Sequence, residues 1–111
     1  MEITLEQMAV YTFRELSPVS KRYLSVEKVA WVIRHRFDYV SRLTYKQKCT
    51  VSAARVTEVV QRRLARSNYY VAKSLIRLVL KAEEACYTRL LLMEQEAFSL
   101  EDEDTQWGIA A

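Results

Sequence analysis

The sequence has almost no glycine and almost no proline. Its 111 residues include one of each, and the glycine is Gly108, close to the C-terminal end. Collagen-like, linker-like and turn-rich all-β chains need many of both residues, so these classes are excluded. A glycine-rich phosphate-binding loop is excluded for the same reason. Hydrophobic residues at 50% with charged residues at 28% exclude a wholly disordered chain. The class that remains after these exclusions is an all-α protein.

Cysteine and histidine are also scarce. Cys49 and Cys86 have only His35 as an imidazole companion, and no CxxC spacing occurs, so we expect no metal and no cofactor. His35 stands between two arginines, and no nucleophile and orienting carboxylate are grouped with it, so we expect no enzymatic activity. Two isolated cysteines in a helical domain are expected to be reduced, packed thiols.

Long apolar runs are missing as well. The longest strictly apolar run covers residues 29–33, whereas a membrane-spanning helix needs about 20 apolar residues. The first residues carry no basic region of the kind that opens a signal peptide. We therefore expect a soluble, cytoplasmic protein.

Four helices are predicted from apolar residues three and four positions apart and from capping residues. The first follows a capping box at Thr4 and Gln7 and ends at Ser17-Pro18, where a short new turn could also begin. The others are capped near Ser25, near Thr50 or Ser52, and near residues 67–68. The predicted helices cover about residues 5–16, 25–42, 52–66 and 69–99, with 44–49 as a short exposed connection.

These helices predict one domain and one tail. Residues 1–99 are expected to form a small four-helix bundle with a long C-terminal helix. Residues 100–111 are expected to be a flexible, disordered tail, since they begin with acids at 101–104 and have no apolar period.

The last predicted helix carries more apolar surface than one bundle needs. One stripe runs from Ala72 to Ala97, and a second stripe is turned from it by about 100°. Three shorter helices can hardly cover both stripes. We therefore expect a homodimer, or a protein partner, at the second stripe, which consists of Ile76, Leu80, Tyr87 and Leu91.

Charge is segregated along the chain. Residues 1–20 carry a net charge of −2, residues 21–81 carry +12, and residues 82–111 carry −7. In the helix at 52–66, arginines lie opposite the apolar face formed by Ala53, Val56, Val60 and Leu64. A dense cationic face favours binding to duplex DNA, because cations release counterions from phosphates. The candidate DNA-binding residues are Arg34, Arg42, Lys46, Lys48, Ser52, Arg55, Arg62 and Arg66.

The order of helix, connection and basic helix over residues 25–66 is similar in pattern to a helix-turn-helix. It departs from that motif because residues 41–50 are longer than the usual tight turn and contain no glycine. Residues near the start of the basic helix are the ones that would reach base edges, namely Lys48, Ser52 and Arg55.

Two functions remain open. The first is a DNA-binding transcriptional or accessory regulator, whose acidic tail would compete with phosphate for the basic face. The alternative is a non-enzymatic protein-interaction module, such as a small inhibitor, adaptor or assembly factor. It would hold a larger partner through the last helix and the tail with Trp107, and an acidic partner would suit the same arginines.

Overall fold

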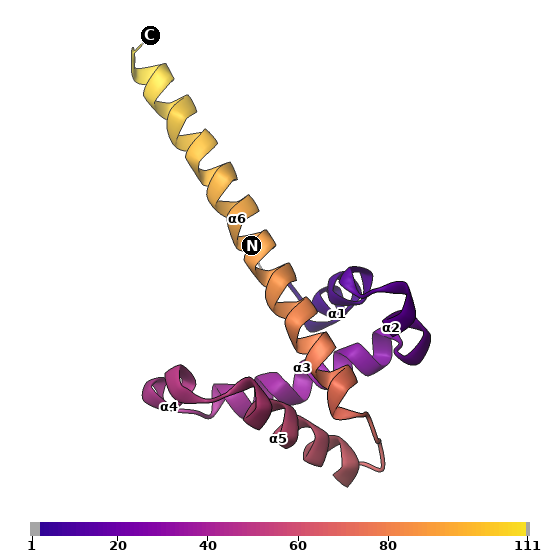
Figure 1. Cartoon of the computed structure of the whole chain (residues 1–111). Helices are drawn as coiled ribbons and strands as arrows, with labels where there is room; N and C mark the ends of the chain where they lie inside the picture. The colour runs from indigo at the N-terminus through magenta and orange to yellow at the C-terminus, as the bar shows by residue number, and fades with distance from the viewer. Residues whose placement is uncertain (1–2, 111) are drawn as a thin grey trace.

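Every regular element in the described part of the chain is an α-helix. The computed structural model describes the backbone of residues 3–110 and the side chains of residues 3–96. The predicted all-α fold is confirmed, but two short helices, α2 and α4, add to the four that the sequence predicts. The helices within these residues are α1 (Leu5–Glu15), α2 (Pro18–Tyr23), α3 (Val26–Ser41), α4 (Tyr45–Thr50), α5 (Ala53–Arg66) and α6 (Lys73–Ala110) (Figure 1).

The helix starts follow the predicted caps. At α1, the Gln7 backbone N–H donates to Thr4 Oγ1 at 3.1 Å, and the Thr4 N–H donates to Gln7 Oε1 at 3.0 Å. Ser17 caps α2, with Pro18 as its first residue, and Ser25 caps α3. Each cap satisfies a backbone N–H that the first helical turn leaves without a partner.

Helix α4 replaces the connection expected at residues 44–49. Thr44 and Gln47 form the same reciprocal capping box as Thr4 and Gln7, with the Gln47 N–H donating to Thr44 Oγ1 at 3.2 Å. The connection was therefore predicted wrongly as irregular, because this box was overlooked in a segment without apolar period. It was predicted correctly as exposed, since no residue of α4 is buried.

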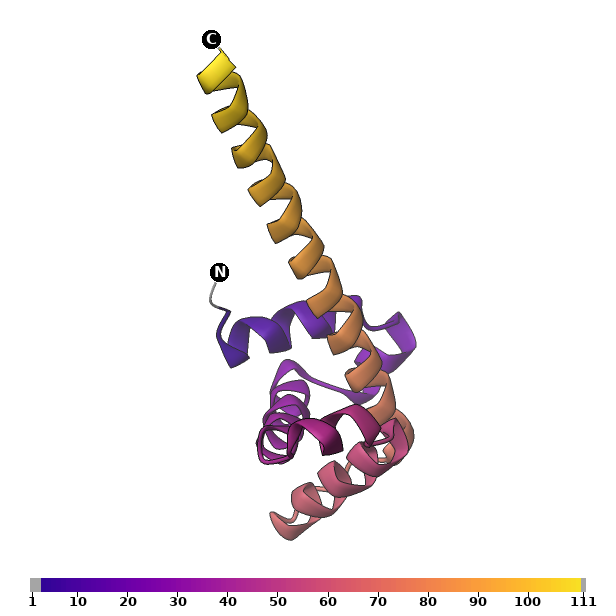
Figure 2. The same cartoon turned by 90° about the vertical axis from the view of Figure 1, so that its left-hand side faces the viewer.

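The core lies around α3, which contacts α1, α5 and α6 (Figure 2). On α3, apolar spacing in the sequence predicts a core stripe that includes Phe37 and leaves Val32 on the outer face. The buried face is rotated from that stripe, because Val32 is fully buried and Phe37 is 58% exposed. The cause is that α3 is covered from two sides, by α1 and by α5. The buried cluster consists of Ala9, Leu16, Leu24, Val29, Val32, Ile33, Val56, Val60, Leu64, Val71, Ile76 and Val79.

Helix α6 begins at Lys73, later than expected. Val71 is buried in the core, and the Gln61 side-chain amide donates to the Val71 carbonyl at 3.1 Å. Asn68 just before this segment has a φ of 58°, a left-handed conformation that asparagine tolerates. The chain therefore stays non-helical long enough to place Val71 under α5.

Helix α6 also continues beyond residue 99, to Ala110, and leaves the rest of the molecule (Figures 1 and 2). The molecule is accordingly elongated, with principal extents of 63 × 36 × 19 Å. The backbone at 100–110 is helical where a flexible tail was expected. The side chains of that tail, Trp107 among them, lie outside the described residues, and its flexibility stays a prediction.

Candidate nucleic-acid interface

Helix α5 separates apolar from cationic side chains. Val56, Val60 and Leu64 are buried in the core. Opposite them, the predicted residues Arg55, Arg62 and Arg66 are exposed. The 11 residue steps from Arg55 to Arg66 span about 16 Å at the standard helical rise, so the arginines form a straight cationic edge. Ala53, which was expected on the apolar core face, is exposed instead, because it lies at the first turn of α5.

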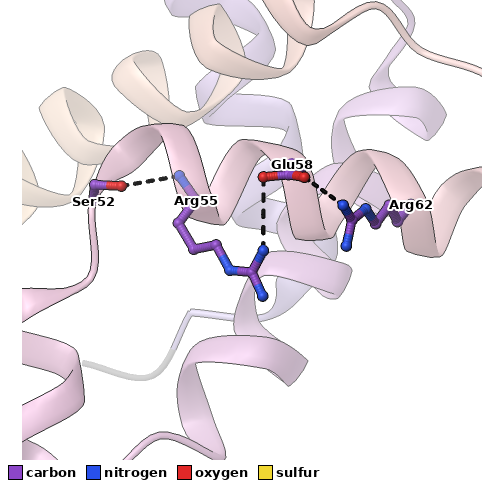
Figure 3. A network of polar contacts seen from close by, with 4 residues as sticks. All are labelled: Ser52, Arg55, Glu58 and Arg62. Atoms are coloured by element: carbon purple, nitrogen blue, oxygen red, sulfur yellow. Dashed lines mark hydrogen bonds and ion pairs between the residues drawn. The ribbon is translucent and has the colours of Figure 1, made fainter.

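One acid interrupts this cationic edge. Glu58 forms ion pairs with both Arg55 and Arg62, and the Arg55 Nη1 to Glu58 Oε2 distance is 3.7 Å (Figure 3). The guanidinium side chains stay 53% and 61% exposed. Exposed pairs of this kind contribute little to stability, roughly 0–1 kcal/mol, so Glu58 holds neither arginine strongly. No ion pair engages Arg66 within the described residues.

Ser52 already has a structural role. Its Oγ accepts the Arg55 backbone N–H at 3.1 Å and so caps α5 (Figure 3). Its own O–H remains available as a donor. Ser52 therefore fixes where α5 begins, and the first turn presents unpaired N–H groups beside the small side chains Ala53 and Ala54.

The remaining predicted cations precede this helix start in the chain. Arg42 forms the C-cap of α3, and Lys46 and Lys48 lie on α4; all three are exposed. Residues 39–57 contain no acid, so all four charged residues in this stretch are cations. Arg34 is exposed on α3, about two helical turns before Arg42.

Helices α4 and α5 are joined by Val51 and Ser52 alone. This pair is closer to a helix-turn-helix than the predicted pairing of the helix at 25–42 with the basic helix. It still departs from the motif, because α4 buries none of its residues against α5.

An aromatic row on α3 faces α5 and was not predicted. Trp31 stacks on His35 with 6.0 Å between ring centroids, and the Arg63 guanidinium lies 5.7 Å from the centre of the Tyr39 ring. Burial lowers the pKa of His35. His35 is half-buried, and its Nε2 atom is buried without a hydrogen-bond partner in the described residues. The four-residue steps between Trp31, His35 and Tyr39 are the signal that could have identified this row.

A second cationic row was also missed. Lys73, Arg77 and Lys81 are exposed on the first turns of α6, again four residues apart. The apolar stripes of this helix do not by themselves predict such a row. These three exposed cations of α6 can therefore serve as a control of equal charge for the three arginines of α5.

The predicted partner-facing residues divide into two groups. Ile76 is fully buried in the core of its own chain, and Leu80 is half-buried against that core. Ile76 is therefore removed from the partner-facing set, because α3 and α5 cover the start of α6. Tyr87 and Leu91 are 55% and 43% exposed, so the described residues leave much of this part of the stripe uncovered.

The described residues also bear on metal, thiol and membrane-spanning features. Within residues 3–96, no three His, Cys, Asp or Glu side chains lie close enough to hold a metal ion. Cys49 and Cys86 are free thiols, the first exposed and the second buried. In the described part of the chain, no helix has the length and low polarity that crossing a bilayer requires.

Comparison with protein families, curated proteins and solved structures finds no match to this chain. Its function is therefore inferred from its own residues.

Proposed function

We propose that the protein binds duplex DNA through the cationic surface of α4 and α5, as a transcriptional or accessory regulator in the cytoplasm. The observation that carries the proposal is the exposed arginine edge of α5, which continues into a stretch without acids at residues 39–57. The DNA phosphates would replace Glu58 as partners of Arg55 and Arg62. Each phosphate neutralised by an arginine would release counterions that had been bound to the DNA. Ser52 supports this role by holding the start of α5 in place.

The test compares two triple variants of equal charge. Arg55, Arg62 and Arg66 are changed to Ala in one protein, and Lys73, Arg77 and Lys81 in the other. Affinity for random-sequence duplex DNA is measured across a salt series. Log affinity falls with log salt, and we expect the α5 variant to reduce the steepness of this fall by about three. The α6 variant is expected to reduce it by less than about one.

Equal losses in the two variants would contradict the proposal, because binding would then follow net charge rather than the α5 surface. Circular dichroism serves as the folding control. All six side chains are exposed, so both variants are expected to keep their helical content.

The Glu58→Gln variant provides a complementary test, because it is expected to bind DNA more tightly than the original protein. The change keeps the size of the side chain but removes the charge that engages Arg55 and Arg62. We expect tighter DNA binding at low salt, with the gain shrinking as salt rises. Glu6→Gln, which removes an exposed acid from α1, is the control and is expected to change affinity less. Unchanged affinity for Glu58→Gln would mean that these arginines do not contact phosphate.

The homodimer expected from the last helix is a second proposal and rests on a different observation. Phe37 and Tyr87 are large, exposed side chains on either side of an open apolar groove. We propose that two copies pair through α6 at this face, as the exposed part of the predicted stripe suggests. Sedimentation of the full chain over a range of concentrations tests this pairing, and a monomer at all concentrations would contradict it.

A further inference from the structure

The groove is formed by three parts of the chain that meet beside α6. Residues 3–8 at the start of α1, residues 33–37 of α3 and residues 83–87 of α6 line a volume of about 370 Å³. A neighbouring hollow of about 540 Å³ adds the first turn of α5 and shares four residues with it. The walls are mainly apolar, whereas the shared residues are Arg36, Phe37, Glu83 and Tyr87.

The groove contains a buried ion pair whose hydrogen bonding is incomplete. Arg36 on α3 donates to Glu83 on α6. The Glu83 side chain is only 9% exposed, and its second oxygen, Oε2, is buried without a partner in the described residues. The Nε atom of Arg36 is likewise buried without one. Such atoms carry a free-energy cost until a hydrogen-bonding group reaches them, so an occupant needs both a donor and an acceptor.

Helix α6 itself presents a ridge that fits this groove. Glu83, Tyr87, Leu91 and Gln95 are spaced by four residues and so form one i±4 ridge on the helix surface. Glu83 and Tyr87 line the groove, whereas Leu91 and Gln95 are exposed farther along the helix. The chain's own groove cannot receive Leu91 and Gln95, because α6 runs straight away from the body (Figure 2).

We propose that the groove is the docking site for the Leu91–Gln95 segment of a second copy, with the two α6 helices antiparallel and related by a two-fold axis near residue 89. This inference rests on the pairing of two copies proposed above and does not depend on DNA binding. In this register, Gln95 of one copy lies opposite Glu83 of the other, and Leu91 lies opposite Tyr87. The contact is self-complementary, as a two-fold interface requires.

The chemistry of Gln95 matches what the groove lacks. Its amide NH₂ donates, as Glu83 Oε2 requires, and its carbonyl accepts, as Arg36 Nε requires. Leu91 provides apolar area for Tyr87 and for the apolar wall beside it. A second copy therefore supplies both the polar pair and the apolar body that would fill this groove.

The same register also brings opposite charges together. With residue 83 opposite residue 95, the acidic run at positions 101–104 lies alongside positions 77–74 of the other copy. Arg77, at one end of this stretch, and Lys73, just beyond the other end, are both exposed, whereas positions 74–76 are uncharged. A parallel pairing would instead align the acidic runs of both copies and make them repel each other.

Cysteine cross-linking tests the register. In a Cys49→Ser background, a Tyr87→Cys protein is mixed with a size-tagged Leu91→Cys protein and oxidised gently. Cys86 is buried and stays in place. We expect the tagged–untagged product to dominate, because residues 87 and 91 lie opposite each other only in the antiparallel pair. Cross-linking of each variant mainly with itself would indicate parallel helices and overturn the proposal.

Leu78→Cys is the matched control. Leu78 and Leu91 are each 43% exposed, but they lie about 140° apart around α6. We expect little product between the Leu78→Cys and Tyr87→Cys proteins. An equal yield would show that the cross-links arise from random collision, and would overturn the proposal. Sedimentation of the unmodified chain distinguishes two negative results. A monomer would contradict the pairing of two copies, whereas a dimer that gives no mixed cross-linked product would contradict only the antiparallel register.

Gln95→Glu tests the polar contact. It would place a carboxylate against Glu83 of the other copy, and we expect the dimer dissociation constant to rise by about tenfold or more. Gln95→Ala, which removes the amide without adding charge, is expected to have a smaller effect. Gln95 is exposed in the single chain, so both variants should keep the fold. Dimerisation of Gln95→Glu at the unmodified strength would overturn the proposal.

Discussion

The part of α6 whose side chains are described has a first half, residues 73–86, and a second half, residues 87–96. The two halves have similar apolar content but different surroundings. In residues 73–86, Ile76, Val79 and Cys86 are buried by the rest of the chain. In residues 87–96, Leu92 and Met93 are 54% and 57% exposed. The comparison shows that an apolar stripe predicts that a face will be covered, without indicating whether the same chain covers it.

The largest expected effect follows directly from this contrast. Ile76→Ala should lower the free energy of unfolding by about 2–5 kcal/mol, because it leaves a cavity in the core. Leu92→Ala should change it by less than about 0.5 kcal/mol, since the side chain is exposed and is not on the proposed ridge. Chemical denaturation of dilute protein measures both. Equal losses would mean that the second half of α6 is also covered within the chain.

A smaller effect concerns the buried acid in the first half of α6. Burial raises the pKa of Glu83, and this outweighs the opposite effect of Arg36. Because the folded pKa lies above the unfolded value, the protonated carboxyl favours folding, and stability falls as pH rises through the folded pKa. We therefore expect Glu83→Gln to exceed the original protein in stability at neutral pH, and this advantage to disappear at acidic pH below the unfolded pKa.

Urea unfolding of dilute protein at several pH values measures this difference. Asp38→Gln, which removes a half-buried acid from α3, serves as a control from outside the groove. If Glu83→Gln is less stable at neutral pH, the attraction between Arg36 and Glu83 outweighs the cost of burial.

The smallest effect is expected at the boundary between the two halves. Arg89 donates two hydrogen bonds to the Glu15 carboxylate at the end of α1, and the distance from Arg89 Nη2 to Glu15 Oε2 is 3.0 Å. The Arg89 side chain is 60% exposed, so water screens the pair. Arg89→Ala should leave the free energy of unfolding nearly unchanged. A loss as large as that of Ile76→Ala would place the end of the core farther along α6.

Much of the fold could be predicted because its signals are local. The caps at Thr4, Ser17 and Ser25 depend on residues within one turn, and the structure has all three. Helix α4 has an equally local signal at Thr44 and Gln47, which was missed for want of an apolar period. The start of α6 was misplaced for another reason, since Val71 is drawn into the core by tertiary packing.

The candidate site shows the same division. The outward position of Arg55, Arg62 and Arg66 follows from helical periodicity, and so does the pairing of Arg62 with Glu58. The groove could not be predicted in this way. It depends on the meeting of α1, α3 and α6, so that Phe37 is left exposed and Glu83 is buried.

The difference between the two cysteines provides a chemical handle. Cys86 is buried, and burial raises its pKa, so little of it is in the reactive thiolate form. Cys49 is exposed on α4, next to Lys48 in the candidate DNA-binding surface. A maleimide dye should therefore label the unmodified protein at Cys49 alone, and its fluorescence would report directly on contact between this surface and DNA.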